Sequence, residues 1–235
     1  MAHDNSATPP DFLKSFENVE AVARYTDGPI RFVPGLDALH RMTSVLLAEN
    51  TPDNARVLVL GAGGGLELKA LATAHPRWTF VGVDPAQPML DLAKRTLGPL
   101  LNRVELVKGY IDDASEIPFD AATCLLTLHF LEPAARLHTV REIHRRLKPG
   151  APFVAAHISF PQLPSERKGW LARYVSFGVE SGADEKMAAS ASEAVGRFLP
   201  LLEPAHDEEI LKEAGFPNPT LFYAAFTWRG WITHA

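Results

Sequence analysis

Glycines dominate the turn after the first predicted strand, residues 61–65. Gly61, Gly63 and Gly65 follow the apolar residues 57–60 directly, and a helical pattern begins straight after them. A short run that is apolar on both faces is typical of a strand in a parallel sheet, where ligands bind beyond the carboxyl ends of the strands. Glycine allows a tight turn there and leaves the backbone open to a ligand. The pattern therefore predicts a ligand-binding loop.

An acidic residue stands at the matching place on the next strand. Asp84 ends the second predicted strand, residues 80–84. A carboxylate at that edge of the sheet can accept hydrogen bonds from both hydroxyls of a ribose, and such bonds are strong because the acceptor is charged. The loop and Asp84 together indicate a ligand that contains a nucleoside.

The spacing of the glycines separates three kinds of cofactor. A nucleoside triphosphate would require G-x-x-x-x-G-K-[ST], and no lysine follows these glycines in the required position. A dinucleotide would require G-x-G-x-x-G, but the sixth position is Leu66. G-x-G-x-G remains, which is the pattern of S-adenosylmethionine binders. A tight turn without a ligand is the competing interpretation, and the flanking strand, the flanking helix and Asp84 count against it.

Strands and helices alternate through the centre of the chain. Short apolar runs predict strands at residues 57–60, 80–84, 104–107, 121–128 and 152–157, with helical spacing between most of them. This alternation favours right-handed crossovers. It predicts an α/β fold with a doubly wound, mostly parallel sheet and helices on both faces.

The flanking segments predict a cap and an insertion. Residues 1–11 are expected to form a tail, and residues 12–50 are predicted to be helical, so residues 1–52 form a tail with a helical cap and residues 53–235 the main domain. Residues 161–203 interrupt the alternation, with a loop predicted at 176–183 and a helix at 187–199. We expect this insertion to lie over the ligand site. The chain then continues with a helix at 208–214 and two closing strands joined near 228–230.

The composition of the chain limits the binding partners and the cellular location that we expect. The 235 residues carry a net charge of −5 and one cysteine, Cys124, so no disulfide can form within the chain. The start of the chain lacks a signal-peptide pattern and no apolar run is long enough to cross a membrane, so we expect a cytoplasmic protein without a membrane partner. The charge disfavours nucleic acid but leaves one basic helix, residues 139–150, open as a local patch; a solvated helix face is favoured.

Longer stretches carry a family resemblance. The segments VLVLGAGGGLE, FVGVDPAQPML, FDAATCLLTLHFLEP, REIHRRLKPGAPFV and LKEAGFPNPTLFYAAFTWRGW resemble class I S-adenosylmethionine-dependent methyltransferases. The resemblance runs from about residue 53 to residue 157 and again from 211 to 235. It implies a Rossmann-like sheet of seven strands whose last strand is antiparallel, with S-adenosyl-L-methionine as cofactor.

A narrower resemblance assigns candidate contacts. FVPGLDALHRM, LTLHFLEP and LKPG are similar to the carboxy-S-adenosylmethionine synthase branch of these enzymes. The resemblance implies that the cofactor-binding loop includes Gly61, Ala62 and Gly63, and that Asp84 binds the ribose with Pro85 beside it. It also implies that Tyr110 and Ile111 contact the adenine and that Leu125 is the contact from the fourth strand.

The positions special to that branch have changed. Its tyrosine after the Pro-Gly turn is Leu36 here, its strand-four asparagine is Leu125, and residues 188–193 contain no cation for the extra carboxylate, Arg197 being the nearest arginine. An unpaired buried carboxylate is costly. We therefore expect plain methyl transfer to a small molecule. A carboxy-S-adenosylmethionine synthase or a tRNA-modification relative is the first alternative, and a non-catalytic binder of an adenosyl ligand is the second.

Two further departures concern the broader family. Val59 stands where the first strand usually carries an acid, and Tyr110 stands where an aspartate usually follows the third strand. Asp112 or Asp113 is expected to replace the missing contact to the adenine amino group, or else the ring of Tyr110 stacks on the adenine.

Methyl transfer from a sulfonium needs alignment more than acid–base chemistry, so catalytic residues stay unassigned. His129 is the best base candidate by position and His157 ends a strand at the same edge, but a structural role is favoured for both. Tyr25, Arg31 and Phe32 in the cap are candidates for substrate contact, with packing the favoured role. No residues have metal-ligand spacing. A homodimer is left open.

Overall fold

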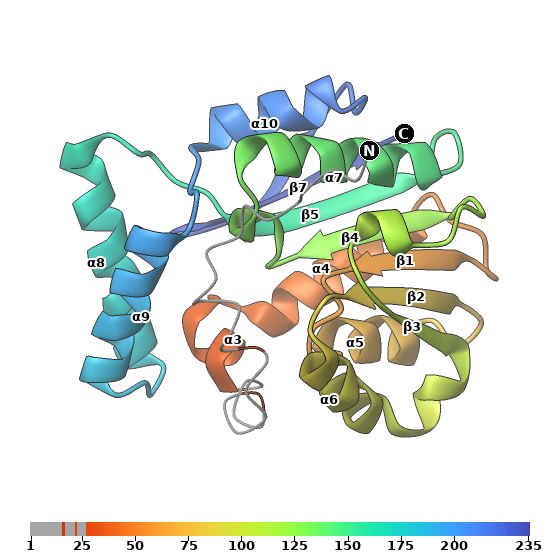
Figure 1. Cartoon of the computed structure of the whole chain (residues 1–235), viewed down its shortest axis with the longest axis horizontal. Helices are drawn as coiled ribbons and strands as arrows, with labels where there is room; N and C mark the ends of the chain where they lie inside the picture. Colours follow the sequence, from red (N-terminus) through yellow and green to blue (C-terminus); the bar gives the residue numbers. More distant parts are fainter. Residues whose placement is uncertain (1–15, 17–21, 23–26) are drawn as a thin grey trace, which may run out of the picture.

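A seven-stranded sheet forms the centre of the protein (Figure 1). The computed structural model describes residues 16, 22 and 27–235. The strands lie in the order β3-β2-β1-β4-β5-β7-β6, and only β7 runs against its neighbours, β5 and β6. Their bounds are β1 (Arg56–Leu60), β2 (Thr79–Asp84), β3 (Val104–Lys108), β4 (Ala121–Leu125), β5 (Pro152–Ile158), β6 (Thr220–Ala225) and β7 (Trp228–His234). The predicted α/β class, the mostly parallel sheet and the antiparallel last strand are confirmed.

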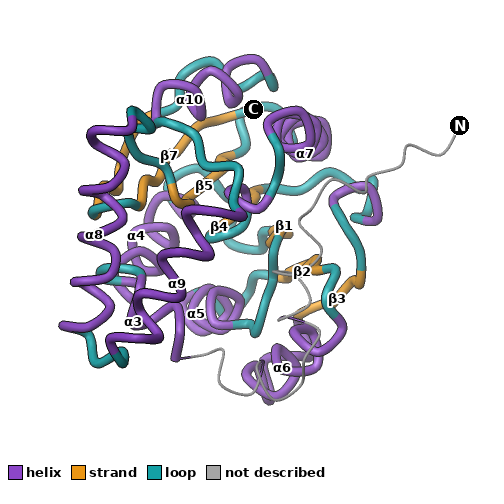
Figure 2. The backbone as a smooth tube through the Cα atoms, turned by 60° about the vertical axis from the view of Figure 1, so that its left-hand side comes forward, coloured by secondary structure: helices purple, strands orange, loops and turns teal. Residues whose placement is uncertain are grey.

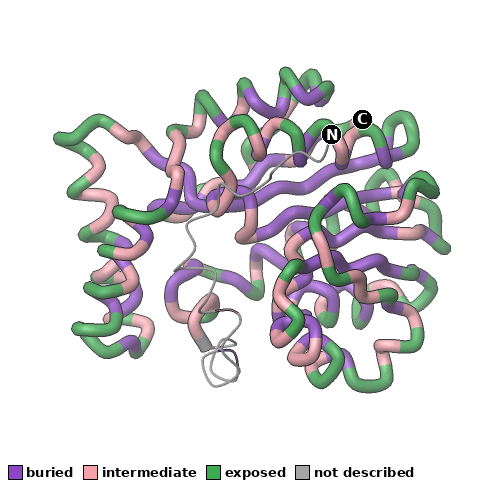
Figure 3. The backbone as a smooth tube through the Cα atoms, viewed as in Figure 1, coloured by how far each residue is buried: buried purple, intermediate pink, exposed green. Residues whose placement is uncertain are grey.

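Helices cover both faces of this sheet (Figures 1 and 2). One face carries α7 (Pro133–Arg146) and α10 (Pro204–Glu213), and the other carries α4 (Leu36–Ala48), α5 (Leu66–Ala74) and α6 (Gln87–Leu97). Val57 and Val59 of β1 belong to the core on the α5 side, whereas Leu58 and Leu60 belong to the core on the α7 side. Residues 57–60 of this strand are all apolar because both faces of the strand are buried there (Figure 3).

Residues 27–50 of the cap form two helices rather than one. Within its described part, α3 (Asp27–Phe32) ends before Pro34, and α4 begins after Gly35, which adopts a left-handed φ of 67°. The C-terminal strands hold this corner: the Trp228 indole donates a hydrogen bond to the Phe32 carbonyl at 2.9 Å, and the Tyr223 hydroxyl donates one to the Pro34 carbonyl at 2.6 Å. The single helical segment predicted for residues 12–50 is therefore broken at 33–35.

The insertion consists of the paired helices α8 (Pro164–Glu180) and α9 (Glu185–Phe198), which stand beside α3 at one end of the molecule (Figure 2). The loop predicted at 176–183 was wrong for its first half, because α8 continues to residue 180. Gly178, which suggested a loop, is needed for packing: a Cβ there would overlap the ring of Phe32, and that ring stacks on Tyr174 at 5.0 Å.

Two element ends also differ from the prediction. The fourth strand stops at Leu125, because Leu126 takes a positive φ of 55° and turns the chain. The closing strands are joined at residues 226–227, and residues 228–230 already pair with β5. In the described part of the chain, no helix combines the length and apolarity needed to cross a membrane.

Candidate cofactor site

A cavity of about 560 Å³ opens at the carboxyl ends of β1, β2 and β4. The glycine loop, the end of β2, the turn after β3 and the end of β4 all contribute to its wall. All eight residues predicted as cofactor contacts line it: Gly61, Ala62, Gly63, Asp84, Pro85, Tyr110, Ile111 and Leu125. The fold thus brings together positions that are up to 64 residues apart between Gly61 and Leu125.

The first and third glycines of the loop, Gly61 and Gly65, are each required by a different contact. Gly61, Gly63 and Gly65 have φ values of 78°, 50° and 82°, which L side chains rarely adopt. A Cβ on Gly61 would overlap the side chain of Thr127, and a Cβ on Gly65 would lie 2.9 Å from the Cα of Ala93 in α6. The first glycine therefore lets the loop approach the end of β4, and the third lets it pack against α6.

Asp84 joins the end of β2 to this loop. Its Oδ2 accepts a hydrogen bond from the N–H of Gly63, and its Oδ1 accepts one from the N–H of Ala86, both at 2.9 Å. Burial raises the pKa of Asp84, and the two backbone hydrogen bonds oppose the shift. Each carboxylate oxygen has a second lone pair. Asp84 can thus accept two further hydrogen bonds from a ligand.

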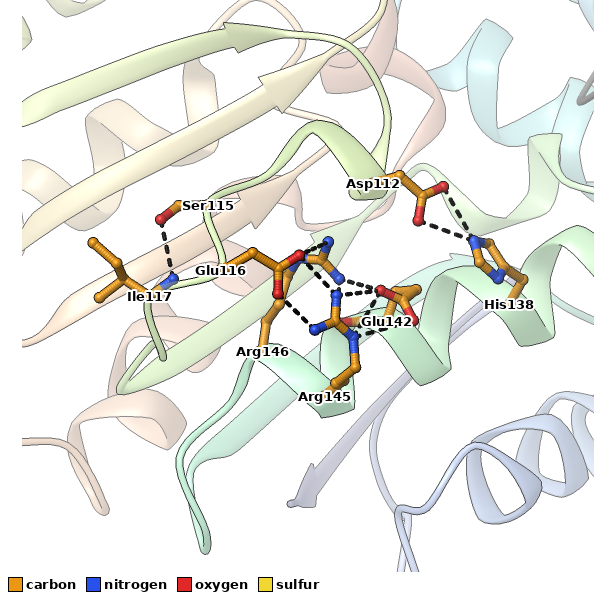
Figure 4. Close-up of polar contacts among 8 residues, drawn as sticks. All are labelled: Asp112, Ser115, Glu116, Ile117, His138, Glu142, Arg145 and Arg146. Carbon is orange, nitrogen blue, oxygen red and sulfur yellow. Dashed lines mark hydrogen bonds and ion pairs between the residues drawn. The ribbon is translucent and has the colours of Figure 1, made fainter. Parts of the chain in front are cut away.

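The turn after β3 forms another part of the wall. Asp113 accepts a hydrogen bond from the N–H of Tyr110 at 2.8 Å, and Asp112 lies 3.1 Å from Nε2 of His138 in α7 (Figure 4). Both acids are thus engaged within the protein. The side chain of Tyr110 is 45% exposed and lines the cavity, so its ring has room to stack on a planar ligand.

Sequence comparison points to one class of protein. A family profile for a methyltransferase domain matches residues 57–150, the segment that contains the glycine loop, Asp84 and β4. Residues 57–150 are therefore similar to a methyltransferase domain. Carboxy-S-adenosyl-L-methionine synthases from Methylococcus capsulatus and Campylobacter lari are 28% and 24% identical to the chain over 225 and 216 residues, which cover 93% and 92% of it and 93% and 91% of those proteins. The chain is therefore similar to carboxy-S-adenosyl-L-methionine synthases over most of its length.

Solved methyltransferase structures share the fold at low identity. An O-methyltransferase family protein from Burkholderia thailandensis aligns with a TM-score of 0.67 at 16% identity, over 94% of this chain. A human N-acetylserotonin methyltransferase solved with SAM aligns with a TM-score of 0.60 at 12% identity, over 96% of this chain. The chain spans 61% and 59% of the lengths of those two structures.

The cavity wall also contains residues that were not predicted from the sequence. They come from the cap, from the start of α5 and from the segment that follows β4, and they include Phe16, His40, Glu67, Thr127, Phe130 and His138. Phe16 and Phe130 meet edge to face at 5.9 Å across this wall. Of these residues, Glu67 could have been found from the sequence, because it is the second residue after the last glycine of the loop.

His129 and His157, the two base candidates, do not line the cavity. Nδ1 of His129 accepts a hydrogen bond from the N–H of Ile158 at 3.4 Å, and Nε2 of His157 lies 3.1 Å from Asp207. Burial, and then the nearby His157 and Arg136, hold the pKa of His129 well below its ordinary value. The structural role that the sequence favoured is the one that fits both side chains.

The other candidates in the cap and the insertion lie away from the cavity wall. Phe32 packs on Tyr174, and neither Phe32 nor Arg31 lines the cavity. Tyr25 lies outside the described residues. No residue of the insertion, 161–203, lines the cavity, so the expectation that it lies over the ligand site was wrong. The described part of the cap, with Phe16, Pro29, Leu36 and His40, forms that wall instead.

Every cation of the basic segment 139–150 is paired. Arg145 binds Glu116 and Glu142 at 2.6 and 2.8 Å, and Arg146 pairs with the same two carboxylates (Figure 4). Arg141 pairs with Glu213 at 2.8 Å, and Lys148 pairs with Asp120 at 2.6 Å. Arg145 and Arg146 lower the pKa of Glu142 to about 2. This helix therefore presents a neutralised surface rather than a basic patch.

Proposed function

We propose that this protein transfers a methyl group from S-adenosylmethionine to a small-molecule acceptor. The observation that carries the proposal is the cavity at the ends of β1, β2 and β4, where a loop with no room for a Cβ at Gly61 or Gly65 meets a buried acid with spare acceptor capacity. This arrangement suits the nucleoside and amino-acid halves of the cofactor without a phosphate site.

Different residues of the cavity would bind different parts of the cofactor. The backbone of Gly61, Ala62 and Gly63 would lie along the amino-acid half, Asp84 beside Pro85 would bind the ribose, and Tyr110 with Ile111 would contact the adenine, while Leu125 adds an apolar surface. When bound, the cofactor supplies an already activated methyl group. The protein then has to align the acceptor with that methyl group and exclude water, because holding the two reactants in a reactive geometry accelerates the transfer.

Methyl transfer is favoured over a carboxylated cofactor by the charges around the cavity. Among the described residues, the cationic or titratable basic side chains in its wall are Lys108, His40 and His138, and no arginine contributes. His138 is paired with Asp112, and burial lowers the pKa of His40 and so favours its neutral form. Lys108 is exposed at the end of β3, and Leu36 and Leu125 add apolar surface, so a buried carboxylate would lack a buried cation as its partner.

The second candidate is a carboxy-S-adenosylmethionine synthase. It is favoured by the names of relatives that match the chain over more than nine-tenths of its length. The arginine expected for the extra carboxylate has no substitute in the insertion: Arg197 lies over the ring of Phe198 at 5.2 Å, and neither residue lines the cavity.

A small acceptor is favoured over nucleic acid because the cations of residues 139–150 are paired and the net charge is −5. We further propose that residues 1–52 act as the cap that selects the acceptor and residues 53–235 as the methyltransferase domain. A cytoplasmic location and a homodimer remain predictions, which fractionation and light scattering would test.

Three measurements test the proposal. Isothermal titration with S-adenosylmethionine and S-adenosylhomocysteine should show binding to both, and absence of binding by either would refute the cofactor. Mass spectrometry of ligand released from purified protein should find the uncarboxylated cofactor or its product; a carboxylated species would instead support the second candidate. Release of S-adenosylhomocysteine with a panel of acceptors then separates an enzyme from a non-catalytic binder.

A further inference from the structure

Glu67 is a buried acid in the cavity wall that the proposed contacts leave unused. It lies in the first turn of α5, immediately after the glycine loop, and is 7% exposed. It lines the cavity, yet its Oε1 is buried without a hydrogen-bond partner among the described residues. A buried carboxylate without a partner is costly, so its presence beside a ligand cavity calls for an explanation.

The groups around Glu67 provide no positive charge. The hydroxyl of Thr123 on β4 is close enough to act on the carboxyl, but it makes no hydrogen bond within the described part of the protein. Thr123 is the register partner of Val59 on β1, so the two strand positions beneath the loop offer one hydroxyl and one apolar side chain. Burial raises the pKa of Glu67 to about 7, although Thr123 opposes the shift.

Each of the other acids in the cavity wall either has a hydrogen-bond or ion-pair partner or is exposed to solvent. Asp84 and Asp113 accept backbone hydrogen bonds, Asp112 pairs with His138, and Glu132 is exposed. Glu67 alone among the described acids of this wall combines burial with an unpartnered oxygen. The group that would satisfy it is a cation carried by the ligand, because a charged partner stabilises the ionised carboxylate.

We infer that Glu67 binds the ammonium group of the cofactor's amino-acid half. The inference rests on the proposed function, which supplies a ligand with an ammonium group, and goes beyond it by assigning that group to a side chain outside the loop. The competing role for Glu67 is a purely structural one, as a neutral acid packed under the loop beside Thr123.

The test compares two ligands that differ in the group concerned. S-Adenosylhomocysteine carries the ammonium group, whereas 5′-methylthioadenosine keeps the nucleoside and lacks the amino-acid half. Glu67→Gln preserves the shape of the side chain and removes its charge. We expect this variant to bind S-adenosylhomocysteine about 10- to 100-fold more weakly, the usual effect of losing a hydrogen bond between charged groups. Its affinity for 5′-methylthioadenosine should change less than about twofold, as should both affinities of the control Glu105→Gln on the exposed side of β3.

Proton release gives a second measurement that a structural role would not change. Titrations near pH 6 in buffers of different ionisation enthalpy should show that the wild-type protein releases protons when it binds S-adenosylhomocysteine, because the ammonium group ionises Glu67. Glu67→Gln should show less release.

Several results would overturn the inference. Equal losses for both ligands would assign Glu67 to the shape of the loop, and an unchanged affinity for S-adenosylhomocysteine would show that no ammonium contact exists. If the wild-type protein bound 5′-methylthioadenosine with the same affinity as S-adenosylhomocysteine, the amino-acid half would have no site here. If it bound neither ligand, the proposed function itself would fail, which differs from all of these outcomes.

Discussion

Asp84 on β2 holds Gly63 in the loop that follows β1, through a 2.9 Å hydrogen bond from the glycine N–H to the carboxylate. The carbonyl of the preceding residue, Val83, accepts hydrogen bonds from the N–H groups of Gly61 and Ala62 at 2.9 and 3.0 Å. The end of β2 therefore fixes the loop and presents the ribose acid at the same time, so a change at one affects the other.

Replacing Asp84 should weaken cofactor binding. We expect Asp84→Ala to reduce the affinity for S-adenosylhomocysteine by about 1–3 kcal/mol, because hydrogen bonds to a charged acceptor and the anchor of the loop are both lost. Isothermal titration measures the change. Asp91→Ala is the matched control, since Asp91 is an exposed acid of α6 that pairs with Lys94 outside the cavity. Equal affinities of wild type and Asp84→Ala would remove Asp84 from the binding site.

A methyl group at Gly61 should damage the loop more than it would at a glycine with equal backbone strain. Gly61 and Gly182 both have positive φ values, 78° and 87°, but a Cβ on Gly61 would overlap Thr127, whereas the space around Gly182 is open. Gly182→Ala should cost about 1–2 kcal/mol of unfolding free energy from strain alone. Gly61→Ala should cost more and should also weaken binding of S-adenosylhomocysteine, as denaturant unfolding and titration would show. Similar losses of stability for the two variants would mean that contact with Thr127 is unimportant.

Glu67→Gln should stabilise the ligand-free protein at alkaline pH. The pKa of Glu67 is about 7 in the folded protein, above its ordinary value of 4.5, so the folded state binds more protons than the unfolded state between these two values. The contribution of Glu67 to stability is therefore present below about pH 4.5 and is lost as the pH rises through 7. The variant escapes this loss, so its stability relative to wild type should rise by roughly 3 kcal/mol between pH 4 and pH 8.

Urea unfolding at several pH values, without ligand, measures this difference. Glu105→Gln, an exposed acid on β3, is expected to show no comparable trend with pH. A constant difference in stability between Glu67→Gln and wild type across the range would contradict the raised pKa.

The pair Arg136–Asp207 should stabilise the fold without affecting the cavity. Both side chains are 1% exposed, and they join α7 to α10. Burial alone would raise the pKa of Asp207, but His157 and Arg136 outweigh it and lower the pKa to about 2. Asp207 therefore contributes stability above its ordinary pKa of 3.8, and this contribution is lost as the pH falls towards 2.

Asp207→Ala should lower the unfolding free energy at pH 7 by about 3–5 kcal/mol, because it leaves Arg136 buried and unpaired. Glu213→Gln is the matched control, because Arg141 and Glu213 join the same two helices in solvent and an exposed pair contributes at most about 1 kcal/mol. The affinity of the folded Asp207→Ala protein for S-adenosylhomocysteine should stay at the wild-type value. A small destabilisation, similar to that of Glu213→Gln, would be inconsistent with a buried charge pair.

The sheet and the position of the loop could be predicted from local sequence pattern. Residues 57–60 are apolar on both faces, glycines follow them, and Asp84 ends the next strand, so local pattern alone predicted a parallel sheet with its loop at the carboxyl edge. Such features depend on neighbours in the chain and on rules that hold for every parallel sheet.

The other side chains that line the cavity could not be predicted in this way, because they depend on how distant segments pack together. His129 and His157 lie at the expected edge of the sheet, but their side chains contact Ile158 and Asp207 instead of lining the cavity. His40 and Glu67, which lie on helices, do line it. The insertion stands beside α3 rather than over the site, and the cations of residues 139–150 meet carboxylates from other elements, such as Glu116 and Glu213. Each of these outcomes depends on the packing of helices against the sheet, and side-chain direction and charge pairing between distant segments do not follow from local sequence pattern.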